Sequence, residues 1–249
     1  MTNGSSHVDR RFDQTQHTYA ATDLETIEEA RRYAEHVFGL FRPYIGRRVL
    51  EVGAGIGTMS RKLLKAADLV VGIEPNPNCL SRLHEATRGE PRFTLLSCHI
   101  EECDLGDLQR HQLDTVYCVN VLEHIEDDVA ALKMFRDAVV PGGHVLIYVP
   151  AVPAAYGPLD AELGHHRRYS KRALATAFAN AGLDLRTLRY ANPLGLIGWM
   201  YNSHVAKARH HSLDQVRLFE RFVAPWALPL ERLIPPPIGS SLVAVARRG

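Results

Sequence analysis

Hydrophobic residues recur along the chain with two alternating periods. Short apolar runs predict buried β-strands at residues 48–52, 69–74, 93–100, 113–120 and 144–150. Between most of these runs, apolar residues three or four positions apart predict helices at residues 58–65, 78–88 and 127–139. This alternation predicts an α/β fold, a mostly parallel sheet with helices on both faces. Ligands of such sheets bind at the carboxyl ends of the strands, so candidate functional residues should directly follow the strands.

The two ends of the chain extend this pattern. Residues 1–16 are polar, and we expect residues 1–22 to form a flexible N-terminal arm. An amphipathic helix is predicted at residues 23–41, where a single domain covering residues 23–249 begins. Later in the chain, Ser170 is a predicted N-cap for a helix at residues 171–181, which Gly182 ends. Two more strands are predicted at residues 183–190 and 241–246.

Composition narrows the class of protein without naming a function. The 249 residues are 46% hydrophobic and 23% charged, with a formal net charge of +1, which is typical of a globular protein with a full core. A chain so close to neutral is not expected to bind nucleic acid. We find no secretory signal and no apolar run near the roughly 18 residues of a membrane span. The sequence therefore predicts a cytoplasmic protein without an integral membrane segment.

Neither the cysteines nor the acidic residues predict a metal site. The four cysteines form no CxxC pair and are expected to be buried, reduced thiols: Cys79, Cys98, Cys103 and Cys118. Three consecutive carboxylates occur at residues 126–128, but neighbouring carboxylates point in different directions and are more typical of a helix start. We therefore expect no bound metal.

The first predicted strand ends in a glycine-rich motif, VLEVGAGIGT at residues 49–58. Glycines at alternate positions permit a tight turn and a close approach of the backbone to a ligand at the following helix. In a dinucleotide fingerprint the third glycine comes one residue later than Gly57, and Thr58 lies where that glycine is expected. Glu51 would repel a pyrophosphate but attract an ammonium group. The motif therefore favours a cofactor with a methionine moiety over NAD.

The second strand supplies a further acidic residue at its carboxyl end. Glu74 follows the run VVGI and lies 17 positions beyond Gly57. A carboxylate there can accept hydrogen bonds from both hydroxyls of a ribose. The simpler interpretation is a solvated glutamate at a strand end. Together with the glycine motif, Glu74 favours an adenosine-containing cofactor.

LEVGAGIG followed by GIEP resembles the class I S-adenosylmethionine-dependent methyltransferases, over residues 48–149 and more loosely to the C-terminus. The resemblance implies a seven-stranded Rossmann-like sheet whose last, antiparallel strand enters between the fifth and the sixth. It also implies S-adenosylmethionine as the cofactor. The cofactor contacts that it implies are Glu51, Gly53, Ala54 and Gly55 at the methionine moiety, Glu74 with Pro75 at the ribose, His99 and Ile100 at the adenine, and Asn120 with Val121 beside the methyl group. A family member usually has an acidic residue where this chain has His99, so Glu101 or Glu102 remains an alternative contact.

The fourth strand end carries the first candidate for proton transfer. His124 lies four residues after Asn120, so a helical turn would place both on one face. Some members of the family that methylate amines or phenols have a proton-handling residue near this position, which makes His124 a candidate general base. An equally reasonable interpretation is a histidine that only orients the adjacent helix.

Two insertions are expected to form a cap over the strand ends. Residues 151–170, after the fifth strand, are rich in proline, glycine and polar aromatic residues, and residues 193–238 follow the sixth. Within the second insertion, residues 194–201 are apolar enough to line a pocket or a dimer contact, and residues 213–223 suggest an amphipathic helix that packs in the core, caps the site or rests on a membrane. The candidate proton-transfer residues of the cap are His165 and His166. The candidate substrate contacts are Tyr156, Asp160, Arg168, Tyr169 and Trp199, with Tyr19 from the N-terminal arm.

These features predict a methyltransferase that transfers a methyl group to a small-molecule acceptor by in-line displacement. Alignment alone can supply roughly 7–11 kcal/mol, so a base is not obligatory. The acceptor atom could be oxygen, nitrogen or carbon, and the aromatic residues suggest a phenol or an indole. Alternatives are methylation of an envelope lipid or sugar, an NAD-dependent oxidoreductase, and a non-catalytic cofactor-binding protein. A homodimer is possible.

Overall fold

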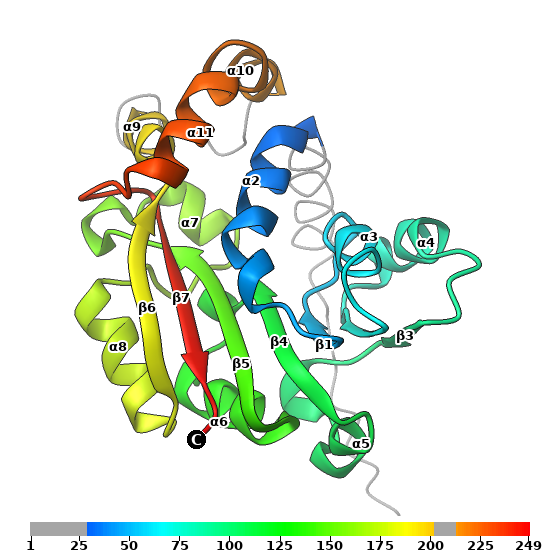
Figure 1. The fold of residues 1–249 in the computed structure, drawn as a ribbon. Helices are drawn as coiled ribbons and strands as arrows, with labels where there is room; N and C mark the ends of the chain where they lie inside the picture. The colour runs from blue at the N-terminus through cyan, green and yellow to red at the C-terminus, as the bar shows by residue number, and fades with distance from the viewer. Residues whose placement is uncertain (1–28, 202–212) are drawn as a thin grey trace, which may run out of the picture.

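The computed structural model describes residues 29–201 and 213–249. These residues form a seven-stranded sheet with helices on both faces and a group of helices above one end (Figure 1). The strand order is β3-β2-β1-β4-β5-β7-β6. The first five strands pair in parallel, and β7 is antiparallel to both β5 and β6. The predicted fold, including the antiparallel last strand between the fifth and sixth, is confirmed.

The strands of this sheet lie close to their predicted positions. Their bounds are β1 Arg48–Val52, β2 Leu69–Ile73, β3 Phe93–Leu96, β4 Leu113–Val119, β5 Val139–Pro150, β6 Asp184–Ala191 and β7 Ser241–Arg247. The third strand is shorter than predicted because the chain turns into a 3-10 helix, η2 (Ile100–Glu102), where the carboxylate of Glu102 accepts a hydrogen bond from the His99 amide. The fifth begins five residues earlier, since Val139 already pairs with Leu113 of β4.

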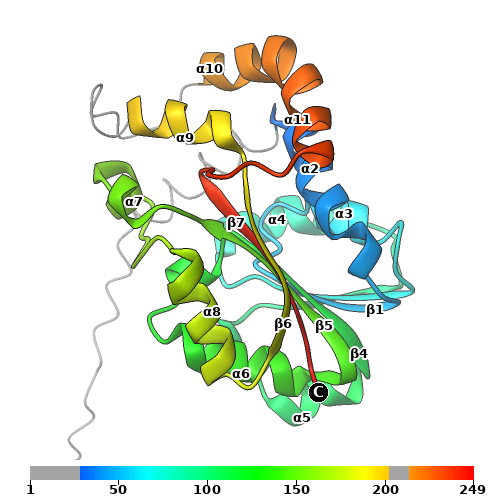
Figure 2. The ribbon, with the colours of Figure 1, turned by 60° about the vertical axis from the view of Figure 1, so that its left-hand side comes forward.

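Helices cover the two faces of the sheet and bury separate apolar clusters. On one face lie α2 (Arg31–Phe41) and α3 (Ser60–Leu63), whose Phe41 and Leu63 pack with Tyr117 and Tyr148 of the sheet. The opposite face carries α5, α6 and α8 (Figure 2). The remaining bounds on these two sides are α4 Pro77–Ala86, α5 Leu105–Arg110, α6 Asp128–Ala138 and α8 Lys171–Asn180.

Most helix ends follow the predicted signals. Ser170 accepts a hydrogen bond from the Ala173 amide at the start of α8, as expected for an N-cap. The helix predicted at residues 58–65 is only one turn long, Ser60–Leu63, because turns replace its first two and last two residues. The short α5 was not predicted, and Asp104 caps it through the Asp107 amide. The N-terminal arm and the first part of the helix predicted at 23–41 lie outside the described residues.

The two insertions lie at the carboxyl ends of the parallel strands (Figure 1). The first contains η4 (Pro153–Ala155) and α7 (Pro158–Glu162). The second contains α9 (Pro193–Met200), α10 (Leu213–Leu218), the π-helical turn η6 (Phe219–Val223) and α11 (Ala224–Leu233). The predicted division into one domain with two cap segments remains a prediction.

Two buried glutamates attach the second insertion to α2. Glu220 of η6 accepts hydrogen bonds from the backbone amides of Arg32 and Tyr33, which are unpaired donors in the first turn of α2. Glu231 of α11 contacts His36 of α2 at 2.9 Å. The negative charge of Glu220 also complements the positive end of the helix dipole. The insertion is thus bound to the core by specific polar contacts.

None of the helices in residues 29–201 and 213–249 is long and apolar enough to cross a membrane. The four cysteines are free thiols, as predicted, but only Cys79 and Cys118 are buried. Cys98 and Cys103 are half-buried, because they flank the turn after β3 rather than lying within the strand.

Candidate functional site

The glycine motif forms a tight loop between β1 and α3. Gly53, Gly55 and Gly57 have φ values of 77°, 55° and 86°, a region that residues with a side chain rarely adopt. A Cβ atom on Gly53 would lie 2.3 Å from Cγ2 of Val121, at the end of β4. The amides of Gly53 and Ala54 donate to the carbonyl of Ile73, which joins the loop to β2. The loop therefore presents bare backbone at the carboxyl edge of the sheet.

Glu74 lies at the adjacent strand end and is fixed in place by two backbone donors. Its carboxylate accepts hydrogen bonds from the Gly55 amide at 2.7 Å and from the Asn76 amide at 2.8 Å. Burial raises the pKa of Glu74, and these two hydrogen bonds oppose the increase. A carboxylate has room for further donors beyond these two. The geometry fits a residue that holds the hydroxyls of a ribose beside the glycine loop.

Glu51 is buried beneath the same loop. Its side chain accepts a hydrogen bond from the Ser60 hydroxyl at 2.6 Å and is 2% exposed. Burial raises the pKa of Glu51 to about 8. The hydrogen bond from Ser60 opposes this increase, and the negative charge of Glu74 adds to it. This carboxyl group is therefore mainly protonated at neutral pH in the absence of a cation. An ammonium group next to it would favour the ionised form.

The remaining predicted cofactor residues follow β3 and β4. His99 is exposed and Ile100 is buried, at the start of η2. Asn120 is exposed and has a φ of 53°, in the left-handed region that asparagine tolerates better than most residues. Its amide donates to the Tyr148 carbonyl, which fixes the turn that leaves β4. All the strand ends that we predicted to contact the cofactor therefore lie on one edge of the sheet, while the individual contacts remain predictions.

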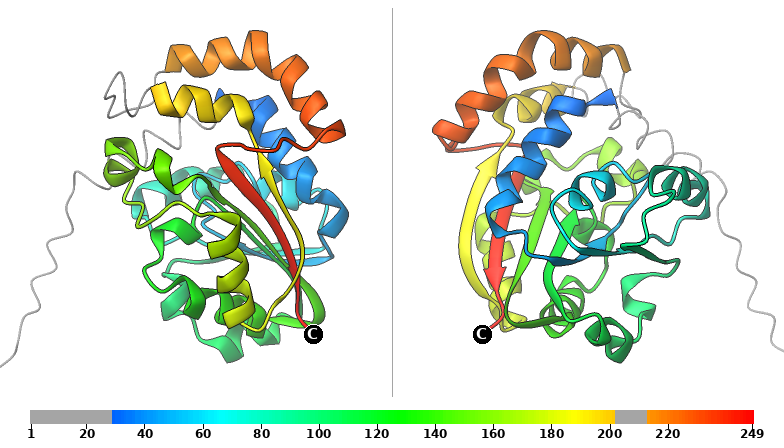
Figure 3. Two further views of the ribbon diagram at one scale, coloured as in Figure 1. Left: turned by 90° about the vertical axis from the view of Figure 1, so that its left-hand side faces the viewer. Right: turned by 45° about the vertical axis from the view of Figure 1, so that its right-hand side comes forward.

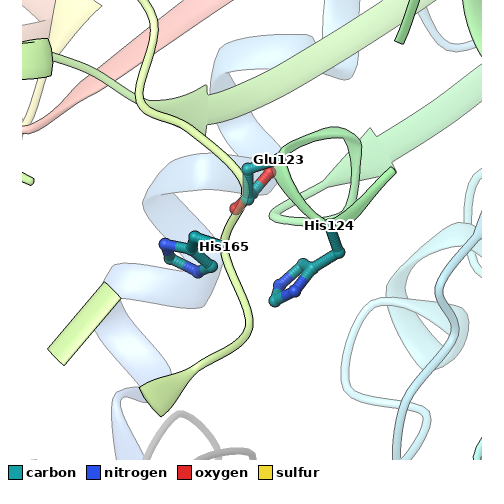
Figure 4. A group of neighbouring side chains, drawn as sticks. All are labelled: Glu123, His124 and His165. Carbon is teal, nitrogen blue, oxygen red and sulfur yellow. The ribbon is translucent and has the colours of Figure 1, made fainter. Parts of the chain in front are cut away.

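A second polar group lies beyond Asn120, on the side of the first insertion (Figure 4). It consists of Glu123 and His124 from η3 (Leu122–His124) and His165 from the loop after α7. The rings of His124 and His165 meet edge to face with centroids 4.7 Å apart. One ligand atom from each of the three residues lies within 4.8 Å of the others, so the group could also hold a divalent ion. Our prediction of no metal remains untested.

Glu123 is an unusual member of this group. The residue is 0% exposed, and neither carboxylate oxygen has a hydrogen-bond partner among the described residues. Burial raises its pKa to about 7, and the nearby charges of His165 and Arg168 partly oppose this increase. A buried carboxylate without partners is costly, so such a group is often part of a functional site.

The two histidines differ in their suitability as a base. Loss of hydration and the nearby His165 lower the pKa of His124, but the residue is exposed, so water limits this shift. His165 is oriented instead: its Nδ1 lies 2.8 Å from Oδ1 of Asp160, which leaves Nε2 free. An imidazole oriented by a carboxylate is the usual arrangement of a catalytic base. Both histidines therefore remain candidate bases, and the contact with Asp160 distinguishes His165 from His124.

Several predicted substrate residues have structural roles in the cap. Asp160 is fully buried between His165 and Arg168, whose Nε donates to Oδ1 at 2.7 Å. Arg168 is itself buried and lies over the ring of Trp199. The Tyr169 side chain is also in the core, where its hydroxyl donates to Asp128. The three side chains support the site from behind, and their contact with a substrate stays a prediction.

The other predicted residues of the cap differ in exposure and in their hydrogen bonds. Tyr156 is exposed and donates to the carbonyl of His165, and Trp199 is half-buried with its indole nitrogen on the Ala155 carbonyl. Both remain predicted substrate contacts. His166 is exposed, and only its backbone amide is fixed, by the carbonyl of Glu123. Tyr19 lies outside the described residues.

Glu123 was not predicted as a site residue. Its signal was present, because an acidic residue between the buried Leu122 and Ile125 contrasts with the exposed carboxylate at Glu126. The pairing of Glu123 with His165 could not be predicted, since helix α6, strand β5 and the first part of the insertion separate the two residues in sequence. A cavity of about 870 Å³ also lies away from this edge, between α2 and α3, and is lined by basic residues such as Arg31, Lys62 and Arg92. It contains none of the predicted cofactor contacts.

The sheet order, the glycine loop and Glu74 define a Rossmann-like fold with a nucleoside-binding edge, of the methyltransferase type. A family model described as "Methyltransferase domain" matches residues 12–188. The chain belongs to this family, the class I S-adenosylmethionine-dependent methyltransferases. S-adenosylmethionine is its cofactor, and the glycine loop, with no room for a side chain at Gly53, fits it. The NAD-dependent alternative is not favoured.

Sequence relatives and solved structures agree with this assignment. The ubiquinone biosynthesis O-methyltransferase of Acinetobacter baylyi is 32% identical over 185 residues, which are 67% of this chain and 74% of that protein. The protein of the same name from Acinetobacter baumannii is 27% identical over 174 residues, 62% of this chain and 72% of the other.

Among solved structures, the magnesium protoporphyrin IX methyltransferase of Synechocystis with bound S-adenosylmethionine has a TM-score of 0.54 at 13% identity, over 91% of this chain and 82% of that one. A Haloferax volcanii putative methyltransferase complex has a TM-score of 0.63 at 14% identity, over 94% and 97% of the two chains. Both likenesses show the fold.

Proposed function

We propose that the chain methylates a hydroxyl group on a small aromatic acceptor, with His165 as the base that receives the proton. The observation that carries the proposal is the Asp160–His165 pair, joined at 2.8 Å on the cap side of the strand ends. The names of the two Acinetobacter relatives, both O-methyltransferases of ubiquinone biosynthesis, support an oxygen acceptor. S-adenosylmethionine supplies the electrophilic methyl group, which the acceptor attacks from the side opposite the sulfur.

The residues of the chain have separate tasks in this proposal. Gly53, Gly55 and Glu74 hold the cofactor, and Asn120 borders the transferred group. Asp160 keeps the Nδ1 proton of His165 in place, so that Nε2 is the nitrogen that accepts a proton. Arg168 balances the charge of Asp160 through the contact at 2.7 Å. Loss of the hydroxyl proton to Nε2 increases the nucleophilicity of the acceptor oxygen.

The acceptor surroundings support an aromatic molecule. Tyr156 and Trp199 come from two different insertions and both carry hydrogen bonds to the first insertion. Aromatic rings contribute large contact areas to a flat ligand. A nitrogen or carbon acceptor and an envelope lipid or sugar remain alternatives that the same assay distinguishes. We also propose that the enzyme acts in the cytoplasm, on a small molecule rather than a nucleic acid, with a homodimer not required.

The test is a radiolabelled methyl-transfer screen with catechol, 4-hydroxybenzoate, a prenylated catechol and ethanolamine. We expect transfer to a phenolic oxygen, and roughly a hundredfold or greater fall in kcat for His165→Ala with unchanged binding of S-adenosylhomocysteine. Asp160→Asn should lower kcat and shift the pH profile, whereas His124→Ala should change kcat less than His165→Ala. Transfer only to ethanolamine, or equal effects of the two histidine variants, would contradict the proposal.

A further inference from the structure

The second insertion carries a helix whose exposed face is apolar. Five large hydrophobic residues of α10, η6 and α11 lie at intervals of three or four positions and are mostly exposed to solvent. They are Leu218 (57%), Phe222 (59%), Trp226 (80%), Leu230 (57%) and Leu233 (80%). Residues at such intervals lie on one side of a helix. Ile234, directly after α11, is 66% exposed and extends the same surface.

The buried side of this helix carries two glutamates among apolar residues. Glu220 and Glu231 are 7% and 5% exposed and bind the first turn and the middle of α2. Ala224 and Leu228 lie between them on the buried side. A surface helix of a globular protein normally places its apolar stripe inward and its charges outward. Here two glutamates face inward beside Ala224 and Leu228, while Phe222 and Trp226 face outward. The helix therefore has a second, exposed apolar face, which indicates that this face meets an apolar medium.

Charge on the exposed part of the insertion is mainly positive. Arg217, Arg221 and Arg232 are exposed, whereas Asp214 is the one exposed acidic residue in the described stretch 213–238. Arg217 also lies 3.6 Å from the exposed carboxylate of Glu29. The guanidinium of Arg221 lies 5.3 Å from the ring centroid of Phe222. Basic residues beside an apolar stripe are typical of helices that lie in the headgroup region of an anionic bilayer.

The position of this face agrees with such a role. The helices α9, α10 and α11 lie together at the carboxyl end of the strands, beyond the edge that holds the candidate site (Figure 3). Helix α9 adds Ile197 and Met200, which are 68% and 41% exposed, at the same end of the molecule. Helix α5 lies at the opposite end of the sheet (Figure 1).

We propose that the exposed face of α10, η6 and α11 docks on the surface of an anionic phospholipid bilayer. Trp226, Phe222 and Leu230 would enter the boundary between headgroups and acyl chains, while Arg217 and Arg221 contact lipid phosphates. A second copy of the chain fits less well. In a two-fold contact the basic residues of one copy would lie close to the same basic residues of the other copy. Asp214 is the only exposed acidic residue of the described stretch 213–238 that could balance them. The docked face would also bring the acceptor edge near the bilayer.

The test is co-sedimentation of the full chain with vesicles of phosphatidylcholine containing roughly a third phosphatidylglycerol. We expect binding that weakens at least roughly tenfold in pure phosphatidylcholine and in high salt. The double variant Phe222→Glu, Trp226→Glu should lose binding but keep its fold, because both side chains are exposed. Arg110→Glu changes the net charge by the same amount on α5 and should bind like the parent.

Tryptophan fluorescence locates the contact. The chain has two tryptophans, so Trp199→Phe leaves Trp226 as the only one. Its emission should shift to shorter wavelength with anionic vesicles and be quenched by brominated lipid. No shift and no sedimentation, or a stable dimer that the double glutamate variant dissociates and that does not bind vesicles, would overturn the proposal. Sedimentation of the double variant equal to that of the parent would overturn it as well.

Discussion

Cofactor binding should release a proton from Glu51. In the free chain, burial raises the pKa of this carboxyl group to about 8, so about 0.9 of the molecules carry the proton at pH 7. The ammonium group of the methionine moiety would favour the ionised form and lower that pKa. Binding at pH 7 should therefore release up to about 0.9 proton, and at pH 9 about 0.1. Since protons are released, affinity should rise with pH, by up to about tenfold per unit below pH 8.

Isothermal titration calorimetry with S-adenosylhomocysteine measures this release directly. The observed enthalpy, plotted against the ionisation enthalpy of several buffers at pH 7, has a slope equal to the number of protons released. Glu51→Gln should reduce the slope and weaken binding by roughly 10- to 100-fold, the loss of a hydrogen bond to a charged group. A slope near zero in the parent protein, or an equal slope in the variant, would refute the role of Glu51.

The same group makes the stability of the free chain depend on pH. The folded pKa of about 8 lies above the ordinary 4.5, so the folded chain holds the proton more tightly than the unfolded chain. Stability from this group is therefore fully present below pH 4.5 and is lost as the pH rises towards 8. Glu51→Gln should be more stable than the parent at pH 8, by ~2–4 kcal/mol, and similar at pH 5, as measured by urea unfolding.

Three further predictions concern other parts of the structure. Gly53→Ala should cost ~2 kcal/mol or more in urea unfolding and weaken cofactor binding, because its Cβ would lie 2.3 Å from Val121. Gly89→Ala, with a similar φ of 75° and no atom within 4 Å, should cost only ~1 kcal/mol, and equal losses would refute the clash. Zinc ions should inhibit turnover by occupying Glu123, His124 and His165, and chelation should restore it, whereas stimulation by zinc would contradict a metal-independent mechanism. Glu220→Ala should destabilise the chain by ~1–3 kcal/mol, because it leaves the Arg32 and Tyr33 amides unpaired, and a loss within the error of urea unfolding would show that these donors find other partners.

The sheet and the cofactor edge were predictable because their signals are local. The glycine spacing and the acidic residue after the second strand each depend on a few adjacent residues, and a parallel sheet brings successive strand ends together. The order of β7 between β5 and β6 came from the family resemblance, since no local property of residues 241–247 specifies their neighbours. The individual cofactor contacts remain predictions.

The acceptor side was predicted less well, because its contacts join distant segments. Asp160 and Arg168 looked like substrate residues, yet they pair with each other in the core and orient His165. The sequence pattern also suggested an amphipathic helix at residues 213–223 that packs in the core, caps the site or rests on a membrane. In the structure Leu213 is exposed, and buried glutamates hold the helix instead. A helix with an outward apolar stripe cannot be distinguished from an ordinary amphipathic helix until its partner is known.

The position of β7 has a consequence for how the chain reaches this structure. Strands β5 and β6 have no direct pairing, and β7 is hydrogen-bonded to both along its whole length. The ribosome synthesises β7 after the six other strands of the sheet. Until residues 241–247 emerge, β5 therefore has an open edge and β6 has no partner strand. Unpaired strand edges recruit other chains. During translation, this interval is when a nascent chain most needs protection by a chaperone.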